Sequence, residues 1–130
     1  MVPSDSSRLS DGRETILIVD DDPVFRRLTG QILRKAGFEV LTAENGRAAM
    51  NQIESTDVDL VLTDLAMPVQ DGFETIKMLR DRRPGLKVIA MSGRFPDLLR
   101  GAKLLGADAT FAKPIRPDEL LKIVRRVIGC

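Results

Sequence analysis

Aspartates end two mainly apolar segments of the chain, where carboxylates could do chemistry. Asp64 ends the stretch 58–64, and Asp20 and Asp21 follow the run Thr15–Val19. A short apolar run bounded by turn signals is typical of a strand that is buried on both faces. Open parallel sheets bind their ligands beyond the carboxyl ends of the strands. We therefore expect Asp64 to be the reactive residue of this chain.

A serine and a lysine end two further expected strands. Ser92 follows Leu86–Met91, and Lys113 follows Asp108–Ala112. All strands of a parallel sheet end at the same edge, so the fold would bring both side chains to Asp64 from distant parts of the sequence.

Three carboxylates at one edge would repel one another, and a single lysine cannot balance them. Mg²⁺ prefers carboxylate and carbonyl oxygens and retains bound waters. The sequence therefore predicts a magnesium site built from Asp20, Asp21 and Asp64. Asp64 could then accept a phosphoryl group, since an aspartyl phosphate is a known form of carboxylate catalysis. The metal and Lys113 would neutralise the charge that develops, and the Ser92 hydroxyl could donate to a phosphoryl oxygen.

Each of these residues also has an ordinary structural interpretation. An aspartate at a strand end is most often a turn or helix cap. Ser92-Gly93 alone is a common turn, and Lys113-Pro114 alone is a surface lysine before a rigid turn. The chemical interpretation is favoured because four of five expected strands end in residues that suit the same reaction.

Apolar spacing, glycine and proline predict the elements that position these residues. The expected strands are Thr15–Val19, Phe38–Thr42, Asp57–Thr63, Leu86–Met91 and Asp108–Ala112. The expected helices run over 23–36, 47–54, from Gly72 to about 82, from Pro96 to about 105, and 117–128. Five strands that alternate with five helices predict an α/β fold, with a parallel sheet, right-handed crossovers and helices on both faces.

Side-chain patterns refine two of these helices. Asp22 is expected to cap the first helix, and Val24, Phe25, Leu28 and Ile32 are its apolar residues at helical spacing. In the fourth helix the recurring apolar residues are Leu98, Ala102 and Leu105.

Composition limits the class of protein. Twenty basic and nineteen acidic residues nearly cancel, so overall charge does not indicate a nucleic acid or membrane partner. The chain has no histidine, which excludes catalysis or metal binding by histidine, and no apolar run is long enough to span a membrane. The single Cys130 fits a reducing cytoplasm. We expect residues 1–13 to form a flexible polar tail and 14–130 to form one domain.

Over about residues 14–128 the chain closely resembles the receiver domain of bacterial two-component response regulators. The matching segments, in order and spacing, are Ile16–Asp22, Leu62–Pro68 with Asp71-Gly72, Ala90–Gly93 and Lys113-Pro114. The resemblance implies a flavodoxin-like three-layer sandwich with strand order 2-1-3-4-5. It also implies that Asp64 accepts a phosphoryl group from a sensor histidine kinase or a histidine phosphotransfer protein.

The resemblance assigns roles around the phosphoacceptor. Asp21 and Asp64 would bind Mg²⁺ directly together with the backbone carbonyl of Ala66, and Asp20 would act mainly through water. Ser92 would hold a phosphoryl oxygen and move toward it on activation. Lys113 would pair with the phosphoryl group, across a cis bond to Pro114. Self-catalysed hydrolysis would limit the lifetime of the phosphoryl group, partly through Ala66 and Arg94.

One position departs from the family pattern. Many receivers carry an aromatic residue three positions before the lysine, and this chain has Thr110 there. Phe111 is adjacent, but strand alternation points it to the opposite face. The aromatic part of the usual switch is therefore not expected in its usual form.

The chain stops at Cys130, so we expect a stand-alone receiver rather than an enzyme, signalling by protein binding or onward phosphotransfer. The receiver portion of a longer regulator remains an alternative. A phosphatase of the haloacid-dehalogenase type, using Asp20, would leave the motif 64–72 unexplained.

The expected output face is the fourth helix, fifth strand and last helix, and either a docking surface or an ordinary solvated face would suit its charge. Its basic residues are Arg94, Arg100, Lys103, Arg116, Lys122, Arg125 and Arg126. No recognition helix for DNA is present.

Overall fold

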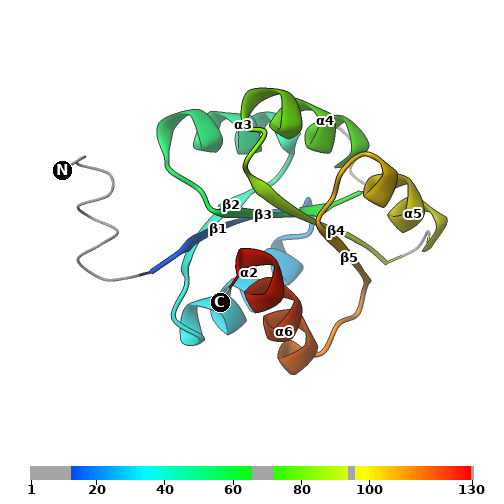
Figure 1. Cartoon of the computed structure of the whole chain (residues 1–130). Coiled ribbons are helices and arrows are strands. Elements are labelled where there is room, and N and C mark those ends of the chain that lie inside the picture. Colours follow the sequence, from blue (N-terminus) through cyan, green and yellow to red (C-terminus); the bar gives the residue numbers. More distant parts are fainter. Residues whose placement is uncertain (1–12, 66–71, 94–95, 130) are drawn as a thin grey trace.

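A parallel sheet of five strands forms the centre of the molecule (Figure 1). The structure is a computed structural model, and it describes residues 13–65, 72–93 and 96–129. In this part of the chain the strands are β1 Thr15–Val19, β2 Glu39–Ala43, β3 Leu60–Asp64, β4 Lys87–Ser92 and β5 Ala109–Ala112. The helices are α2 Pro23–Lys35, α3 Gly46–Ser55, α4 Gly72–Arg82, α5 Pro96–Leu104 and α6 Pro117–Ile128. The strand order is β2-β1-β3-β4-β5 with every pairing parallel, as predicted.

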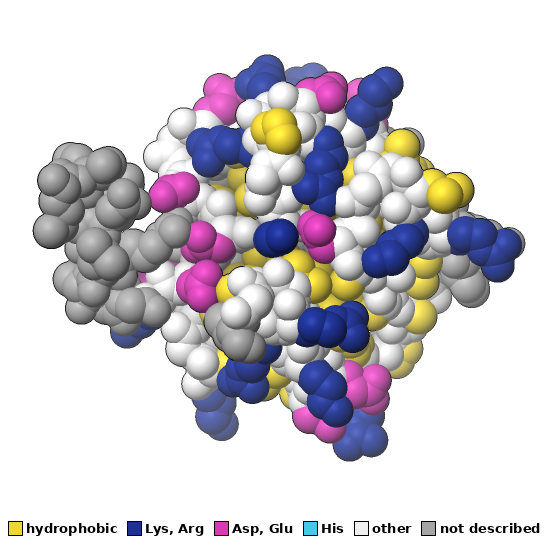
Figure 2. All heavy atoms as spheres, in the orientation of Figure 1, with side chains coloured by type: hydrophobic (Ala, Val, Ile, Leu, Met, Phe, Trp, Pro, Cys, Tyr) yellow, Lys and Arg dark blue, Asp and Glu magenta, His cyan; other side chains and the backbone are white. Residues whose placement is uncertain are grey.

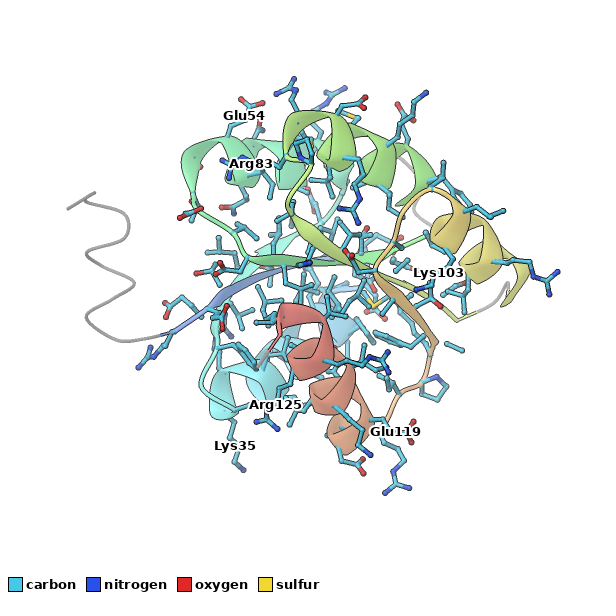
Figure 3. The ribbon with its side chains drawn as sticks, in the orientation of Figure 1. Lys35, Glu54, Arg83, Lys103, Glu119 and Arg125 are labelled. Atoms are coloured by element: carbon cyan, nitrogen blue, oxygen red, sulfur yellow. The ribbon has the colours of Figure 1, made fainter. Side chains whose placement is uncertain are left out.

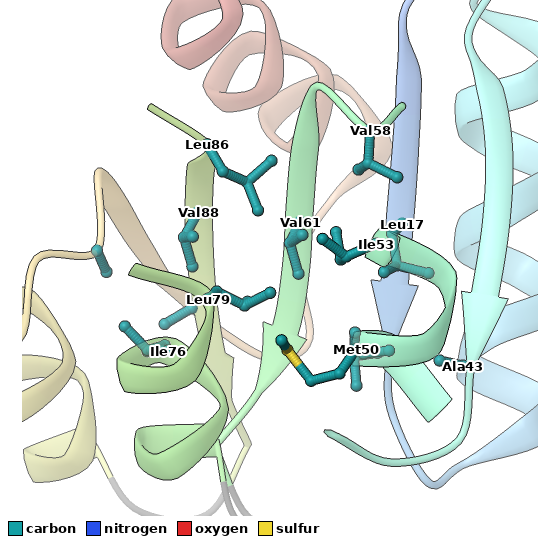
Figure 4. Close-up of a cluster of buried hydrophobic side chains, with 14 of the residues drawn as sticks. Leu17, Ala43, Met50, Ile53, Val58, Val61, Ile76, Leu79, Leu86 and Val88 are labelled. Carbon is teal, nitrogen blue, oxygen red and sulfur yellow. The ribbon is translucent and has the colours of Figure 1, made fainter. Parts of the chain in front are cut away.

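The helices cover both faces of the sheet and make three layers. Side chains alternate along β1, so Leu17 and Val19 face one layer while Ile16 and Ile18 face the other. We call the cluster beneath α3, α4 and α5 the upper core, and the cluster beneath α2 and α6 the lower core (Figure 1). Figure 4 shows the upper core, with sheet residues packed against helices α3 and α4. Its labelled side chains include Leu17, Val61, Val88, Met50, Ile53, Ile76 and Leu79.

The central strand β3 is buried along its whole length, as expected for a strand covered on both faces. It begins at Leu60, three residues later than predicted. Asp59 precedes it and makes a two-way contact with Thr15: its backbone N–H donates to the Thr15 carbonyl, and its side chain accepts from the Thr15 N–H at 2.8 Å. This side-chain hydrogen bond takes the place of a backbone bond between β1 and β3, and so fixes where β3 starts. The strand ends on Asp64, which is itself buried.

Helix boundaries follow the predicted capping residues. The Asp22 side chain accepts from the Val24 N–H at 3.0 Å, and Pro23 occupies the first turn of α2, where its missing N–H costs nothing. Gly37 lies just past the helix with φ of 102°, a left-handed conformation that favours glycine. Gly106 ends α5 in the same way, with φ of 105°. These local signals were sufficient to predict both ends of α2 from sequence.

The apolar residues that recur at helical spacing in α2 and α5 are not all buried. Val24 and Leu28 are 52% and 51% exposed, and the buried residues of α2 are Thr29, Gly30 and Leu33. Gly30 explains the rotation, because a Cβ added there would lie 3.6 Å from the Val40 side chain, so the helix approaches β2 along its small residues. In α5 Ala102 is buried as expected, whereas Leu105 beyond the helix is exposed. The Leu98 side chain lies outside the described residues.

Arg80 joins two loops at the edge of the sheet opposite Asp64. Its guanidinium donates to the carbonyl of Leu86 at 2.7 Å, to the carbonyl of Gly106, and to the Asp108 carboxylate at 2.8 Å. The same carboxylate accepts from the Val88 N–H. Arg80 therefore ties the end of α4 to the segments that precede β4 and β5.

We expect Arg80→Met to lower the free energy of unfolding by about 2 kcal/mol, because carbonyls and a carboxylate lose a charged donor. The measurement is urea unfolding at neutral pH. Arg82→Met is the matched control: Arg82 pairs with Glu54 at the surface, where both side chains are more than half exposed. We expect the control to change stability by less than about 0.5 kcal/mol. Equal losses in both variants would contradict the role of Arg80.

No helix among the described residues is both long and apolar enough to cross a membrane.

Candidate phosphoryl and metal site

Three carboxylates meet where β1 and β3 end. Each of Asp20, Asp21 and Asp64 offers an oxygen, and these oxygens all lie within 4.8 Å of one another. The register explains the meeting, because Val19 pairs with Thr63 and so places Asp20 beside Asp64. The sheet thus brings together the residues that the sequence predicted as metal ligands. Oxygen ligands of this kind suit a hard divalent cation such as Mg²⁺.

The three carboxylates differ in their exposure to water. Asp20 and Asp64 are buried, whereas Asp21 is exposed. Burial raises the pKa of the Asp20 carboxyl, although the hydrogen bonds from Lys113 and from the Asp22 N–H act in the opposite direction. Without further positive charge the site therefore disfavours the ionised form of Asp20, and a bound cation would relieve this cost.

Lys113 contacts two of the three carboxylates. Its Nζ lies 2.6 Å from Asp20 Oδ2 and 3.5 Å from Asp64 Oδ2. The Lys113 backbone N–H donates to the Ser92 carbonyl at 2.9 Å, which fixes the start of the side chain. The peptide bond between Lys113 and Pro114 is cis, as the family resemblance implied.

Ser92 ends β4 next to Asp64. Asp64 pairs with Met91 in the β3–β4 register, so Ser92 stands one residue beyond the partner of Asp64. Its side chain is buried. The structure therefore places Asp64, Lys113 and Ser92 at one edge of the sheet, as predicted from their strand-end positions.

Two residues of α2 contact this site, although the sequence analysis assigned neither of them a role there. Arg26 donates from Nη1 to the Asp20 carbonyl at 2.6 Å, and the Phe25 ring centroid lies 4.1 Å from Lys113 Nζ. The Asp22 N–H also donates to Asp20 Oδ1 at 2.9 Å. Sequence position offered one signal, since Phe25 and Arg26 lie within six residues of Asp20. Their orientation depends on how α2 packs on the sheet.

The neighbouring positions 110 and 111 face opposite sides, as strand alternation predicted. Thr110 pairs with Ala90, a residue of the upper core, whereas Phe111 is buried in the lower core. No aromatic ring therefore occupies position 110. The expectations for Ala66 and Arg94 fall outside the described residues.

Two basic residues of the predicted output face have partners within the chain. Arg116 pairs with Asp118 at 3.3 Å and lies 3.9 Å from Glu119, while Lys103 donates to the Asp108 carbonyl. Figure 3 shows that Lys103 lies on α5 and that Arg125 and Glu119 lie on α6. Figure 2 shows Lys and Arg side chains spread over this view of the molecule rather than gathered in one patch. The remaining described basic residues of this face, all exposed, are Arg100, Lys122, Arg125 and Arg126.

Fold and site together define an α/β domain that carries an acidic cluster and a lysine at the carboxyl edge of its sheet. The family model described as the response regulator receiver domain matches residues 16–125. The chain belongs to this family, the receiver domains of two-component signalling systems.

Relatives of the chain differ in length. Sporulation initiation phosphotransferase F of Bacillus subtilis is 34% identical over 116 residues, which are 88% of this chain and 94% of the relative. The DNA-binding transcriptional regulator NtrC of Bradyrhizobium is also 34% identical, but the match spans 24% of its length. Among solved structures, response regulator TrrA of Thermotoga maritima, in complex with Mg²⁺-BeF, has a TM-score of 0.81 and 31% identity. That match covers 88% of this chain and 98% of TrrA.

Proposed function

We propose that Asp64 accepts a phosphoryl group from a histidine kinase or histidine phosphotransfer protein, with Mg²⁺, and that the phosphorylated chain signals to a protein partner. The observation that carries this proposal is the cluster of Asp20, Asp21 and Asp64, with Lys113 bound to two of its members. A cluster of this composition supports phosphoryl chemistry, because it combines a carboxylate nucleophile with ligands for a charge-neutralising cation.

The transfer step uses the side chains at this edge of the sheet, Mg²⁺, the phosphohistidine donor and a proton from solvent. An oxygen of the ionised Asp64 carboxylate attacks the phosphorus of a phosphohistidine, the P–N bond breaks, and the imidazole leaves with that electron pair and gains a proton. The product is an aspartyl phosphate, a mixed anhydride. In hydrolysis, water attacks the same phosphorus, the P–O bond to Asp64 breaks, and the carboxylate and inorganic phosphate are released. We infer that Lys113 and the Ser92 hydroxyl contact the phosphoryl oxygens in both steps.

Mg²⁺ fits the donor set and would supply neutralisation of the phosphoryl charge. Asp21 and Asp64 would hold it directly, and Asp20 would act mainly through water. The oxygens of the three carboxylates, all within 4.8 Å of one another, support a site that receives positive charge. The carbonyl of Ala66, which the family resemblance adds as a ligand, is part of the same proposal.

Mapping the modified residue tests this function. The chain is incubated with Mg²⁺ and acetyl phosphate, and the adduct is located by mass spectrometry. We expect it on Asp64. Modification of Asp20 with rapid turnover of phosphomonoesters would instead support the phosphatase alternative. Family membership and the contact of Asp20 with Lys113 argue against that alternative.

The protein donor would approach over the first turns of α2. Val24 and Leu28 are about half exposed and lie four residues apart, so they share a face of the helix. This helix begins directly after the acidic cluster, so a donor helix that packs its apolar face here would lie close to Asp64.

We expect Val24→Asp and Leu28→Asp to slow phosphotransfer from a protein donor about ten-fold or more while leaving phosphorylation by acetyl phosphate unchanged. The donor is any purified histidine kinase core that phosphorylates the unchanged chain. Leu104→Asp is the matched control, because Leu104 is 85% exposed at the end of α5 and lies on another face. Equal loss with both kinds of donor would show damage to the site itself, and no loss with the protein donor would contradict the docking proposal.

Output would follow through partner binding at the face of α5, β5 and α6, or through onward transfer of the phosphoryl group. Exposed Arg100, Lys122, Arg125 and Arg126 support a partner with an acidic surface. The longer relatives, such as NtrC, leave a receiver joined to an output domain as the alternative arrangement.

A further inference from the structure

The Lys113 side chain is confined on three sides. Its Nζ contacts the carboxylates of Asp20 and Asp64, and on another side it lies 4.1 Å from the centroid of the Phe25 ring. Gly93 leaves space for the stem, since a Cβ added there would lie 3.4 Å from Lys113 Cβ. The ammonium position is therefore defined by a ring as well as by charges.

The Phe25 ring occupies a fixed place because the helix that carries it is fixed. Asp22 caps α2, and Arg26, the next residue after Phe25, donates to the Asp20 carbonyl at 2.6 Å. Phe25 itself packs against the lower core and is only partly exposed. The start of α2 is therefore held to Asp20 by two hydrogen bonds, from the Asp22 N–H and from Arg26, and this fixes the helix that carries the ring.

The short distance and the burial of Lys113 indicate a favourable cation–π interaction between its ammonium and the Phe25 ring. A lysine ammonium within about 6 Å of a ring centroid is attracted to the face of the ring, and the attraction grows as water is removed. The Lys113 side chain is only 18% exposed. Lysine is otherwise a flexible point charge on a long stem, so a ring beside the ammonium restricts where that charge can go.

We propose that Phe25 is a positioning residue for the phosphoryl chemistry of Asp64, acting by holding the Lys113 ammonium between Asp20 and Asp64. The proposal rests on the proposed phosphorylation of Asp64. Without the ring, Lys113 can turn toward solvent or remain on the closer carboxylate of Asp20. With the ring, the ammonium stays within reach of an oxygen on Asp64 and of a phosphoryl group attached there.

Two variants of Phe25 separate the ring from its bulk. Phe25→Leu keeps an apolar side chain but removes the aromatic face, whereas Phe25→Tyr keeps the face. We expect Phe25→Leu to slow phosphorylation by acetyl phosphate about three- to ten-fold and Phe25→Tyr to stay within about two-fold of the unchanged chain. The NMR signals of the Lys113 Cε methylene should lose their ring-current shift in Phe25→Leu and keep it in Phe25→Tyr.

A double-mutant cycle on urea unfolding isolates the contact from activity. The cycle compares Phe25→Leu in the unchanged chain and in Lys113→Met, and we expect a smaller loss of stability in the second background. Equal losses in both backgrounds, or equal slowing by Phe25→Leu and Phe25→Tyr, would overturn the proposal and leave Phe25 as a packing residue. An unchanged chain that is never phosphorylated on Asp64 would overturn the proposed function as well. The two failures can be told apart, because a failure of the proposed function is seen in the unchanged chain. The double-mutant cycle and the NMR shift test the contact between Phe25 and Lys113 without any phosphorylation.

Discussion

Asp64→Asn is expected to abolish phosphorylation, both by acetyl phosphate and by a protein donor. An amide is a far weaker nucleophile than a carboxylate, so the rate should fall by a factor on the order of 10³ or more. Asparagine has nearly the same shape, and Asp64 ends a strand whose other residues are buried apolar or hydroxyl side chains. The fold should therefore survive the substitution. The measurement is the fraction of modified chain by mass spectrometry after incubation with Mg²⁺ and acetyl phosphate.

Asp57→Asn is the matched control for this experiment. Asp57 is an exposed carboxylate that precedes β3, at the opposite end of the strand from Asp64. We expect its phosphorylation rate to equal that of the unchanged chain, within about two-fold. A phosphoryl group retained in Asp64→Asn, on any other carboxylate, would disprove the assignment of Asp64 as phosphoacceptor.

Removal of Mg²⁺ is expected to have the second largest effect. Chelation with EDTA should slow phosphorylation about 100-fold or more, since the three carboxylates would then repel the incoming phosphoryl group. Mg²⁺ should also stabilise the folded chain, by about 2.7 kcal/mol at a concentration 100 times its dissociation constant. Thermal unfolding with and without Mg²⁺ measures this second effect without any phosphoryl donor.

Neighbouring aspartates provide a matched pair of variants for the metal site. Asp21→Asn removes an exposed member of the cluster and should weaken Mg²⁺ binding about ten-fold or more. Asp22→Asn changes the charge one residue away but retains a good helix cap, because asparagine caps helices as well as aspartate does. We expect Asp22→Asn to keep Mg²⁺-dependent stabilisation. Equal weakening in both variants would indicate a general effect of charge rather than ligation by Asp21.

The fold was predictable because its signals are local. Asp22 and Pro23 start α2 and Gly37 ends it, so the helix could be located without any knowledge of its neighbours. Strand boundaries were predicted less well where a side chain replaces a backbone bond between strands. The third strand was predicted to start at Asp57, but β3 starts at Leu60, after the Asp59 side chain has bonded to the Thr15 N–H. The strand order came from the family resemblance, since alternation of strands and helices does not fix the order.

Sequence by itself determined which residues could do the chemistry. Asp64 and Ser92 are the last residues of their strands, and Asp20, Asp21 and Lys113 directly follow theirs. Parallel strands end at one edge, so the assembly of these residues follows from the alternating pattern. This inference needs no distances.

Only the tertiary structure decided which faces of the helices are buried and how Lys113 is held. Val24 and Leu28 remain exposed because α2 packs on β2 along Gly30, a rotation that helical spacing does not encode. The same packing directs Phe25 onto the Lys113 ammonium, 88 residues further along the chain (113 − 25). Local sequence fixes a helix and its ends, but its rotation on the sheet depends on contacts between distant segments.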